Sequence, residues 1–298
     1  MNTPLKLITS LLANLGANIT RKQYTDKSPA TFSSAFIFNA VTCLVAAICL
    51  FAVGGFGTAS TFTIILGVAF GLVSAIQGMT NIAALQCGPM SYTSVIISFS
   101  TILTALSGKL FFNESIGFAQ IIGIILMLIS FVLAANSTDD KKQSNFKWLV
   151  LCIISFFSCG GIGIMQKVHQ SSEHKNELNS FLTIAFIVAA LACFLAAAVV
   201  KRQEATDNAP SKANKKEAIL MLLLMVISGV CVAANNNLNL YLSGVIPSAI
   251  FFPLVNGGGL VLITLTALII FREKLSKKQW IGLVFGIASV IFLCNPFA

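Results

Sequence analysis

Amide and hydroxyl side chains inside long apolar runs are the groups of this sequence best suited to binding a solute. Each costs free energy in hydrocarbon, so such a side chain usually faces the interior of a helix bundle or a water-filled cavity. Amides donate and accept hydrogen bonds without carrying charge, which suits zwitterions and uncharged polar molecules. Hydrogen bonding between neighbouring helices is the alternative role. The candidate substrate-binding residues are Asn14, Gln77, Asn81, Ser98, Asn235, Asn239 and Asn256.

Four of the asparagines lie within five residues, at positions 235, 236, 237 and 239. Successive residues of an α-helix are about 100° apart, so these four side chains cannot all face one neighbouring helix. Asn235 and Asn239 share a face, and we expect this face to form a cavity wall.

Glycines and a proline interrupt two of the apolar runs, at "FFPLVNGGGLVL" (251–262) and "SCGGIG" (158–163). Proline lacks a backbone donor, so a kink or local unwinding is expected, and glycine allows a ligand or another backbone to approach closely. Interrupted spans in both halves of a chain point to a transporter's binding site, with tight helix packing as the alternative. The candidate hinge or close-approach residues are Gly160, Gly161, Pro253, Gly257, Gly258 and Gly259.

Ionisable residues are missing from the central part of every apolar run. Glu114 and Glu273 fall at predicted helix starts, whereas Lys109 and Lys167 fall near helix ends, from which they can reach water. A proton-coupled carrier normally keeps a titratable group on its pathway. We therefore expect a neutral, amide-rich site.

Enzymatic and cofactor chemistry find little support. His169 and His174 flank a polar loop and are expected to be solvated. Nucleotide-binding glycine motifs, catalytic triads and paired acids at membrane depth are not found in the sequence. We expect no enzyme activity, no metal and no cofactor.

Composition places the chain in the membrane. Of its 298 residues 56% are hydrophobic and only 10% charged, and its mean hydropathy is +0.89, whereas about a quarter of a soluble domain is charged. The net charge of +9 resides in short loops, which fits membrane topology rather than nucleic-acid binding. The expected partners are the lipid bilayer and a small-molecule substrate, with the protein a monomer or a homodimer.

Ten segments are long and apolar enough to be transmembrane helices, which predicts an all-α integral membrane protein. They are 4–20, 30–52, 59–84, 89–111, 116–135, 147–166, 179–200, 217–241, 247–270 and 276–294. All but four of the 19 basic residues lie in or beside the odd-numbered loops. The positive-inside rule therefore places those loops in the cytoplasm and both termini outside.

An internal repeat divides the chain into two halves, 1–138 and 145–298. "KLFFNESIGFAQIIGIILMLISFVL" (109–133) matches "LIIFREKLSKKQWIGLVFGIASVIFL" (268–293). The matched glutamates, glutamines and glycines are Glu114/Glu273, Gln120/Gln279 and Gly123/Gly282, each pair 159 residues apart. A five-helix unit that occurs twice must enter the membrane in opposite directions. The halves are therefore predicted to be inverted repeats with a substrate site between them, near the midplane.

A second, shorter match lies upstream, where "NIAALQCG" (81–88) resembles "NLNLYLSG" (237–244). With the glutamate–glutamine–glycine stretches, these features resemble the drug/metabolite transporter superfamily, and most of all its EamA-like ten-helix members. The resemblance implies a carrier whose helices one to four face helices six to nine, with helices five and ten peripheral. Members of that kind are usually drawn with both termini in the cytoplasm, the reverse of the charge count here.

The function expected is secondary transport of a small polar organic metabolite, amino-acid-like or uncharged, by alternating access around a midplane site. The protein is expected to be a multi-pass protein of the cell membrane, most plausibly a bacterial plasma membrane. Two alternatives stay open. One is export of lipophilic cations or drugs, and the other is a non-transporting membrane scaffold.

Overall fold

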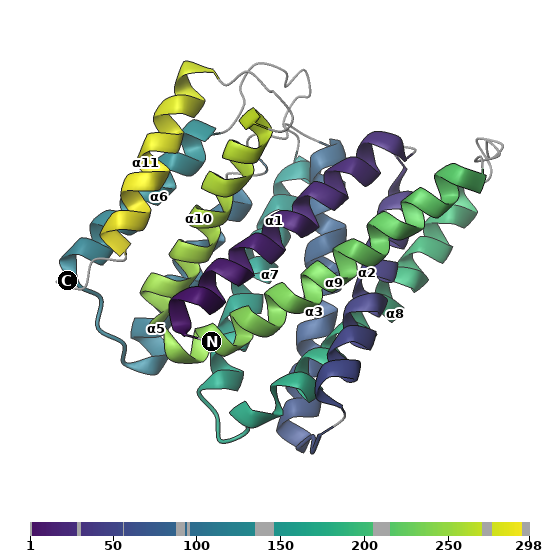
Figure 1. The fold of residues 1–298 in the computed structure, drawn as a ribbon, viewed down its shortest axis with the longest axis horizontal. Coiled ribbons are helices and arrows are strands. Elements are labelled where there is room, and N and C mark those ends of the chain that lie inside the picture. The colour runs from purple at the N-terminus through teal and green to yellow at the C-terminus, as the bar shows by residue number, and fades with distance from the viewer. Residues whose placement is uncertain are drawn as a thin grey trace.

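The computed structural model describes residues 2–28, 31–55, 57–87, 93, 96–134, 146–204, 215–269 and 276–293, and every regular element in these ranges is helical. The helices are α1 (Thr3–Lys27), α2 (Phe32–Gly54), α3 (Thr61–Cys87), α5 (Ser100–Phe112), α6 (Phe118–Ala134), α7 (Phe146–Gln170), α8 (Leu178–Glu204), α9 (Lys215–Val245), α10 (Ser248–Ile269) and α11 (Lys277–Leu293), with a short 3-10 helix η1 (Lys175–Glu177) before α8. The predicted all-α fold is confirmed. Figure 1 shows these helices packed side by side as one bundle.

Each predicted span coincides with a helix of this bundle. Within the described residues six helices are long and apolar enough to cross a membrane, and two shorter apolar helices cover Ile96–Phe112 and Phe118–Leu133. The start of the predicted span 89–111 lies partly outside the described residues. The chain is therefore a multi-pass membrane protein.

Helix α1 is longer than the predicted span of 4–20 and continues to Lys27. Its last turns are held in place because Tyr24 is buried and its ring lies 4.6 Å from the ring of Phe38 on α2. The extension corrects one expectation, since it places Arg21 within a helix of the bundle instead of in a loop.

Packing between the halves follows a pseudo-two-fold axis. Exchanging the repeats turns α1 into α7, α2 into α8, α3 into α9, α5 into α10 and α6 into α11. The extensive contacts obey this exchange, because α1 packs on α9 as α7 packs on α3, while α2–α8, α5–α10 and α6–α11 each map onto themselves. The structure thus has the inverted-repeat arrangement that the odd helix number predicts.

The peripheral pair α6–α11 shows the same symmetry at atomic detail (Figure 1). Ser130 Oγ donates to the carbonyl oxygen of Gly282 at 2.6 Å, and Ser289 Oγ donates to that of Gly123 at 2.7 Å. The two donors are 159 residues apart, as are the two acceptors. Small residues at these crossings let the backbones approach closely.

Both repeats also begin this last helix in the same way. The backbone N–H of Ser276 donates to Gln279 Oε1 at 2.8 Å, and Gln279 N donates to Ser276 Oγ at 3.3 Å, which is a capping box. In the first repeat, Gly117 N donates to Gln120 Oε1 at 2.7 Å. The two matched glutamines therefore satisfy equivalent N-terminal donors.

The glycine-rich segments do not unwind. Helix α10 runs through Pro253 and residues 257–259, and α7 runs through residues 158–163. A kink or local unwinding is expected from the sequence, and of these two the structure excludes unwinding, since both helices continue through these residues. Pro253 loses only one hydrogen bond and is buried among neighbouring helices, which tolerate such a loss at membrane depth. Close approach does occur, since a Cβ at Gly257 would lie 2.5 Å from Met127 Sδ.

Candidate functional site

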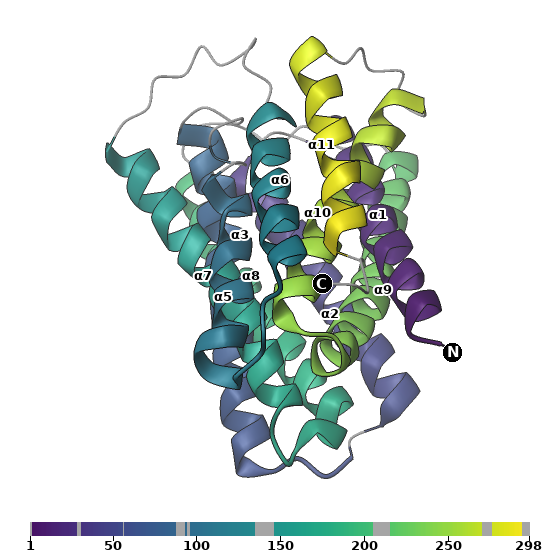
Figure 2. The same cartoon turned by 90° about the vertical axis from the view of Figure 1, so that its left-hand side faces the viewer.

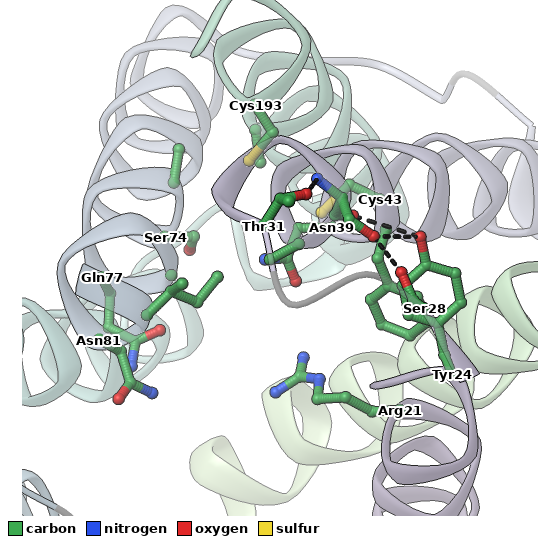
Figure 3. Close-up of a pocket in the computed structure, with 17 residues that line it drawn as sticks. Arg21, Tyr24, Ser28, Thr31, Asn39, Cys43, Ser74, Gln77, Asn81 and Cys193 are labelled. Carbon is green, nitrogen blue, oxygen red and sulfur yellow. Dashed lines mark hydrogen bonds between the residues drawn. The ribbon is translucent and has the colours of Figure 1, made fainter. Parts of the chain in front are cut away.

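A cavity of about 500 Å³ lies between α1, α2, α3 and α8 (Figure 3). This volume is typical of pockets for small molecules. Its polar lining comprises Arg21, Tyr24, Ser28, Thr31, Ser34, Asn39, Ser74, Gln77 and Asn81. Apolar side chains complete the wall.

The described lining of the cavity begins at one end of the bundle and extends about halfway along it. Thr31 caps the start of α2, and Cys43 lies twelve residues further along the chain, so the lining covers about 18 Å of helix axis. Helix α2 has 23 residues and is therefore about 35 Å long. We call this end of the bundle, where α1 ends and α2 begins, the open end.

Two predicted site residues face this cavity together. Gln77 and Asn81 lie one helical turn apart on α3, as their spacing predicts, and Ser74 continues the same stripe. Asn39 contributes a third amide from α2. None of the three amide side chains forms a hydrogen bond with another described residue, so their hydrogen-bonding capacity is free for water or a solute.

Arg21 faces the same space from α1. In Figure 3 its guanidinium group points across the cavity toward Gln77 and Asn81. The side chain is exposed, and its Cζ atom lies 6.0 Å from the ring centroid of Phe38. This cavity is therefore amide-rich but not neutral, whereas a neutral, amide-rich site is expected from the sequence. One signal in the sequence would have found it, because Arg21 lies seven residues after Asn14 and so continues the polar stripe of α1.

Hydroxyl groups at the mouth of the cavity satisfy one another. The hydroxyl groups of Tyr24 and Ser34 lie 3.0 Å apart, and Ser28 also hydrogen-bonds to Ser34. Thr31 Oγ1 accepts from Ser34 N at 3.2 Å and caps α2. The groups without partners therefore lie deeper in the cavity.

Two other predicted site residues, Asn235 and Asn239, lie in the interface between α1 and α9, and a third, Asn14, lies on α1 close to Gly259 of α10. Ser10 Oγ lies 3.0 Å from Asn235 Oδ1 and 2.5 Å from Asn239 Oδ1, and Asn239 Nδ2 donates to Asn235 Oδ1 at 3.2 Å. Asn18 Nδ2 donates to Asn14 Oδ1 at 2.9 Å. Asn235 and Asn239 do share a face, but this face meets Ser10, not the cavity. The four asparagines of α9 do diverge as helix geometry requires.

Asn256 and Ser98 are also separate from the cavity lining. Asn256 Nδ2 on α10 donates to Thr101 Oγ1 on α5 at 2.8 Å, while the rest of its side chain is exposed. Ser98 is half-buried one turn before Thr101. The structure thus brings Gln77 and Asn81 into one cavity and places the other five candidates outside its wall.

The opposite end of the bundle, which we call the sealed end, contains a buried ion pair. Lys167 Nζ on α7 lies 2.6 Å from Glu114 Oε1, and the two side chains are only 7% and 14% exposed. Lys167 also donates to the carbonyl oxygen of Ser243, and Glu114 accepts from Ser248 N at 2.6 Å. Lys167 was expected to reach water, and the structure corrects this. Asn113, in the left-handed conformation (φ 52°), ends α5 and turns Glu114 back toward the bundle.

Further polar contacts join the helices at the sealed end, where the loops α2–α3 and α7–α8 lie together at the bottom of Figure 2. Glu177 Oε2 accepts from Ser60 N at 2.9 Å and from Ser60 Oγ at 2.8 Å. Asn237 Nδ2 donates to Asn179 Oδ1 at 2.9 Å. Several polar groups of the sealed end are therefore paired, whereas the buried atoms His169 Nε2, Thr183 Oγ1 and Ser248 Oγ have no hydrogen-bond partner among the described residues.

His169 belongs to this packed end as well. Its ring is fully buried and stacks on Phe181 with the centroids 4.4 Å apart. It was expected to be solvated beside a polar loop, and the structure corrects that expectation. The cause is that α7 continues to Gln170, so His169 lies on a helix, where its ring meets Phe181 of α8.

The fold and cavity define a class of protein, namely multi-pass helical membrane proteins built from inverted repeats with a solute-sized cavity. The family model of the EamA-like transporter family matches residues 24–136 and again 146–295. The chain therefore belongs to the EamA-like transporter family. Each match lies within one predicted half, and the family resemblance of the sequence is confirmed.

Individual proteins similar to this chain include a bacterial relative and a solved structure. An uncharacterized protein of Haemophilus influenzae is 26% identical over 201 residues, which span 65% of this chain and 62% of that relative. A solved structure described only as the crystal structure of a protein shares 13% identity and a TM-score of 0.68, over 98% of this chain and 99% of the other. At this identity the structural likeness supports the fold alone.

Proposed function

We propose that this protein is a secondary transporter that moves a small polar organic metabolite across the membrane by alternating access. One observation carries the proposal: an amide-lined cavity enters from one end and stops about halfway, while the opposite end is closed by a buried ion pair. A solute can enter such a cavity but cannot pass without a change of conformation.

We propose that this change of conformation is an exchange of conformations between the two repeats. When two inverted repeats exchange conformations, the closed end opens and the open end closes. In the exchanged state Asn237, which corresponds to Asn81, would leave Asn179 and face the new cavity. We propose that the remaining amides, on α1, α9 and α10, contribute to the path in that state. These residues and Ser98 form the rest of the proposed site: Asn14, Ser98, Asn235, Asn239 and Asn256.

The glycine and proline positions are proposed to support this movement by close helix contact. A Cβ on Gly259 would lie 3.2 Å from Asn14 Nδ2, and one on Gly160 would lie 2.8 Å from Leu103 Cδ1. Glycine lets these helices slide with little steric hindrance. Gly257 is as close to Met127, whereas Gly161, Pro253 and Gly258 are proposed to act as hinge residues, since a Cβ on Gly161 would meet nothing within 4 Å.

The basic residues of the loops indicate which end of the bundle faces the cytoplasm. The open end carries the predicted cytoplasmic loops, which hold most of the lysines and arginines. We propose that the structure represents an inward-facing state. Arg21 weighs against export of lipophilic cations, since it places a positive charge in the cavity. The unpaired amides weigh against a pure scaffold, because unpaired polar groups cost free energy unless water or a solute binds them.

The proposal is tested in two steps. First, thermal shifts of the purified protein against a metabolite library identify ligands, because a molecule that binds only the folded form raises the melting temperature. Second, uptake of the ligand is measured in proteoliposomes with Asn81→Leu and with Asn236→Leu. Asn236 is the matched control, since its amide bonds to Val232 O of its own helix.

We expect Asn81→Leu to lower uptake about tenfold, since a substrate group loses its partner, and Asn236→Leu to leave uptake within about twofold. Equal effects of the two substitutions would contradict a role for the cavity wall.

A further inference from the structure

Arg21 places a positive charge in the cavity, where no described residue pairs with it. It forms no ion pair at 4 Å or less and no hydrogen bond with another described residue, and the described lining of the cavity contains no carboxylate. A guanidinium group inside a membrane bundle is expensive unless it meets an anion, water or an aromatic face. The ring of Phe38, 6.0 Å away, covers only one side of the group.

Lys167 is a basic residue at a similar place in the second repeat, and unlike Arg21 it has a carboxylate partner. Lys167 lies in the last two turns of α7, the first helix of its repeat, as Arg21 lies in the last two turns of α1. Lys167 is neutralised by Glu114 at 2.6 Å and donates to a backbone carbonyl oxygen. The residue that corresponds to Glu114 in the second repeat is Glu273, which lies outside the described residues, and the described lining around Arg21 offers no carboxylate.

We propose that the substrate presents a single carboxylate to Arg21, an inference that rests on the transport function proposed above. A guanidinium group matches a carboxylate in two parallel hydrogen bonds. One unpaired cation neutralises one negative charge, so a monoanion fits better than a phosphate dianion. The amides of Asn39, Gln77 and Asn81 then bind the neutral polar part of the same molecule.

The charge preference of the cavity can be measured without knowing the substrate. Ser74 lines the cavity on α3, and Ser74→Cys in a cysteine-free background provides one thiol there. Its labelling rate is compared for an anionic reagent, sulfonatoethyl methanethiosulfonate, and a cationic one, trimethylammonioethyl methanethiosulfonate. Each rate is divided by the rate of the same reagent with free 2-mercaptoethanol, which removes intrinsic reactivity.

Three substitutions separate the charge of Arg21 from general effects. Arg21→Gln removes the cation, Arg21→Lys keeps the charge, and Lys22→Gln removes an equal charge from a neighbouring residue that does not line the cavity. We expect the ratio of the anionic to the cationic labelling rate to fall about tenfold in Arg21→Gln, because the anionic reagent loses the Coulomb attraction of a nearby positive charge. The ratio is expected to stay within about twofold in Arg21→Lys and Lys22→Gln. Size-exclusion profiles verify folding of each variant.

Each result has a distinct meaning. An unchanged ratio in Arg21→Gln, or an equal fall in Lys22→Gln, overturns the carboxylate proposal while leaving the transport proposal intact. Failure of both reagents to label Ser74→Cys in the folded protein overturns the proposed function as well, because the cavity would then not admit water-soluble molecules.

Discussion

The two ends of the bundle contain matching parts in opposite states. At the sealed end α7 packs on α9, whereas the corresponding helices α1 and α3 at the open end are separated by the cavity. Asn237 donates to Asn179, but its counterpart Asn81 bonds to no described residue. Polar residues of one kind therefore hold the structure together where they are paired and are available to a ligand where they are not.

The comparison of the two ends also predicts how substitutions at each end affect folding and binding. Removing the partner of a buried charge such as Lys167 destabilises the protein strongly, because the charge is then left uncompensated. The groups around the open cavity can be solvated, so changing them should affect binding far more than folding. Stability and transport should thus separate between the two ends.

The largest effect is expected from breaking the ion pair. Glu114→Ala leaves Lys167 buried without its partner and should lower the free energy of unfolding by about 3–5 kcal/mol. Thermal unfolding in detergent measures it. Glu173→Ala is the matched control because that carboxylate is exposed. The double substitution Glu114→Met/Lys167→Met should recover most of the loss, and a stable Glu114→Ala variant would contradict a structural role for the pair.

Helix contact near the sealed end should give the next largest effect. A Cβ on Gly71 would lie 2.4 Å from the carbonyl oxygen of Ala185, so Gly71→Ala must push α3 and α8 apart, at a cost of about 1–3 kcal/mol. Gly161→Ala meets nothing within 4 Å and should instead stabilise its helix by about 0.5–1 kcal/mol. Melting temperatures of the two variants should move in opposite directions, and a shared direction would count against the packing argument.

The matched asparagines should separate stability from transport. Asn237→Leu leaves Asn179 without its partner and should cost about 1–2 kcal/mol of unfolding free energy. Asn81→Leu should change stability by less than about 0.5 kcal/mol, since surface-like positions tolerate substitution, while it lowers uptake. Unfolding and uptake measured on both proteins check this, and an equal stability loss would remove the contrast between the ends.

Prediction from sequence succeeded where the signal is local. The apolar runs depend only on neighbouring residues, and the helices that they predict are observed. The stripe of Gln77 and Asn81 is local too. Helical spacing suffices to place such groups on one face.

Prediction failed where the outcome depends on a distant partner. Nothing near Lys167 in the sequence shows that Glu114, 53 residues away, would neutralise it within the bundle. Ser10, which bonds to Asn235 and Asn239, comes from the far end of the chain. Tertiary packing also kept α10 helical through Pro253, where local propensity favours a break.

The smallest effect is expected at the peripheral pair α6–α11, away from both ends. Ser130→Ala and Ser289→Ala each remove one equivalent hydrogen bond and should each cost about 1 kcal/mol of stability. Uptake should stay at the wild-type rate. Thermal unfolding of the two single variants should agree within error, and clearly unequal losses would argue against the two-fold relation of the repeats.

The most direct test of the account measures water access at the two matched asparagines. Asn81→Cys and Asn237→Cys, each in a cysteine-free background, are exposed to a membrane-impermeant maleimide from either side of oriented vesicles. The account predicts fast labelling of Asn81→Cys from the side of the lysine- and arginine-rich loops only, and slow labelling of Asn237→Cys from both sides. Equal labelling of the two positions, or none at Asn81→Cys, would contradict a bundle that is open at one end and sealed at the other.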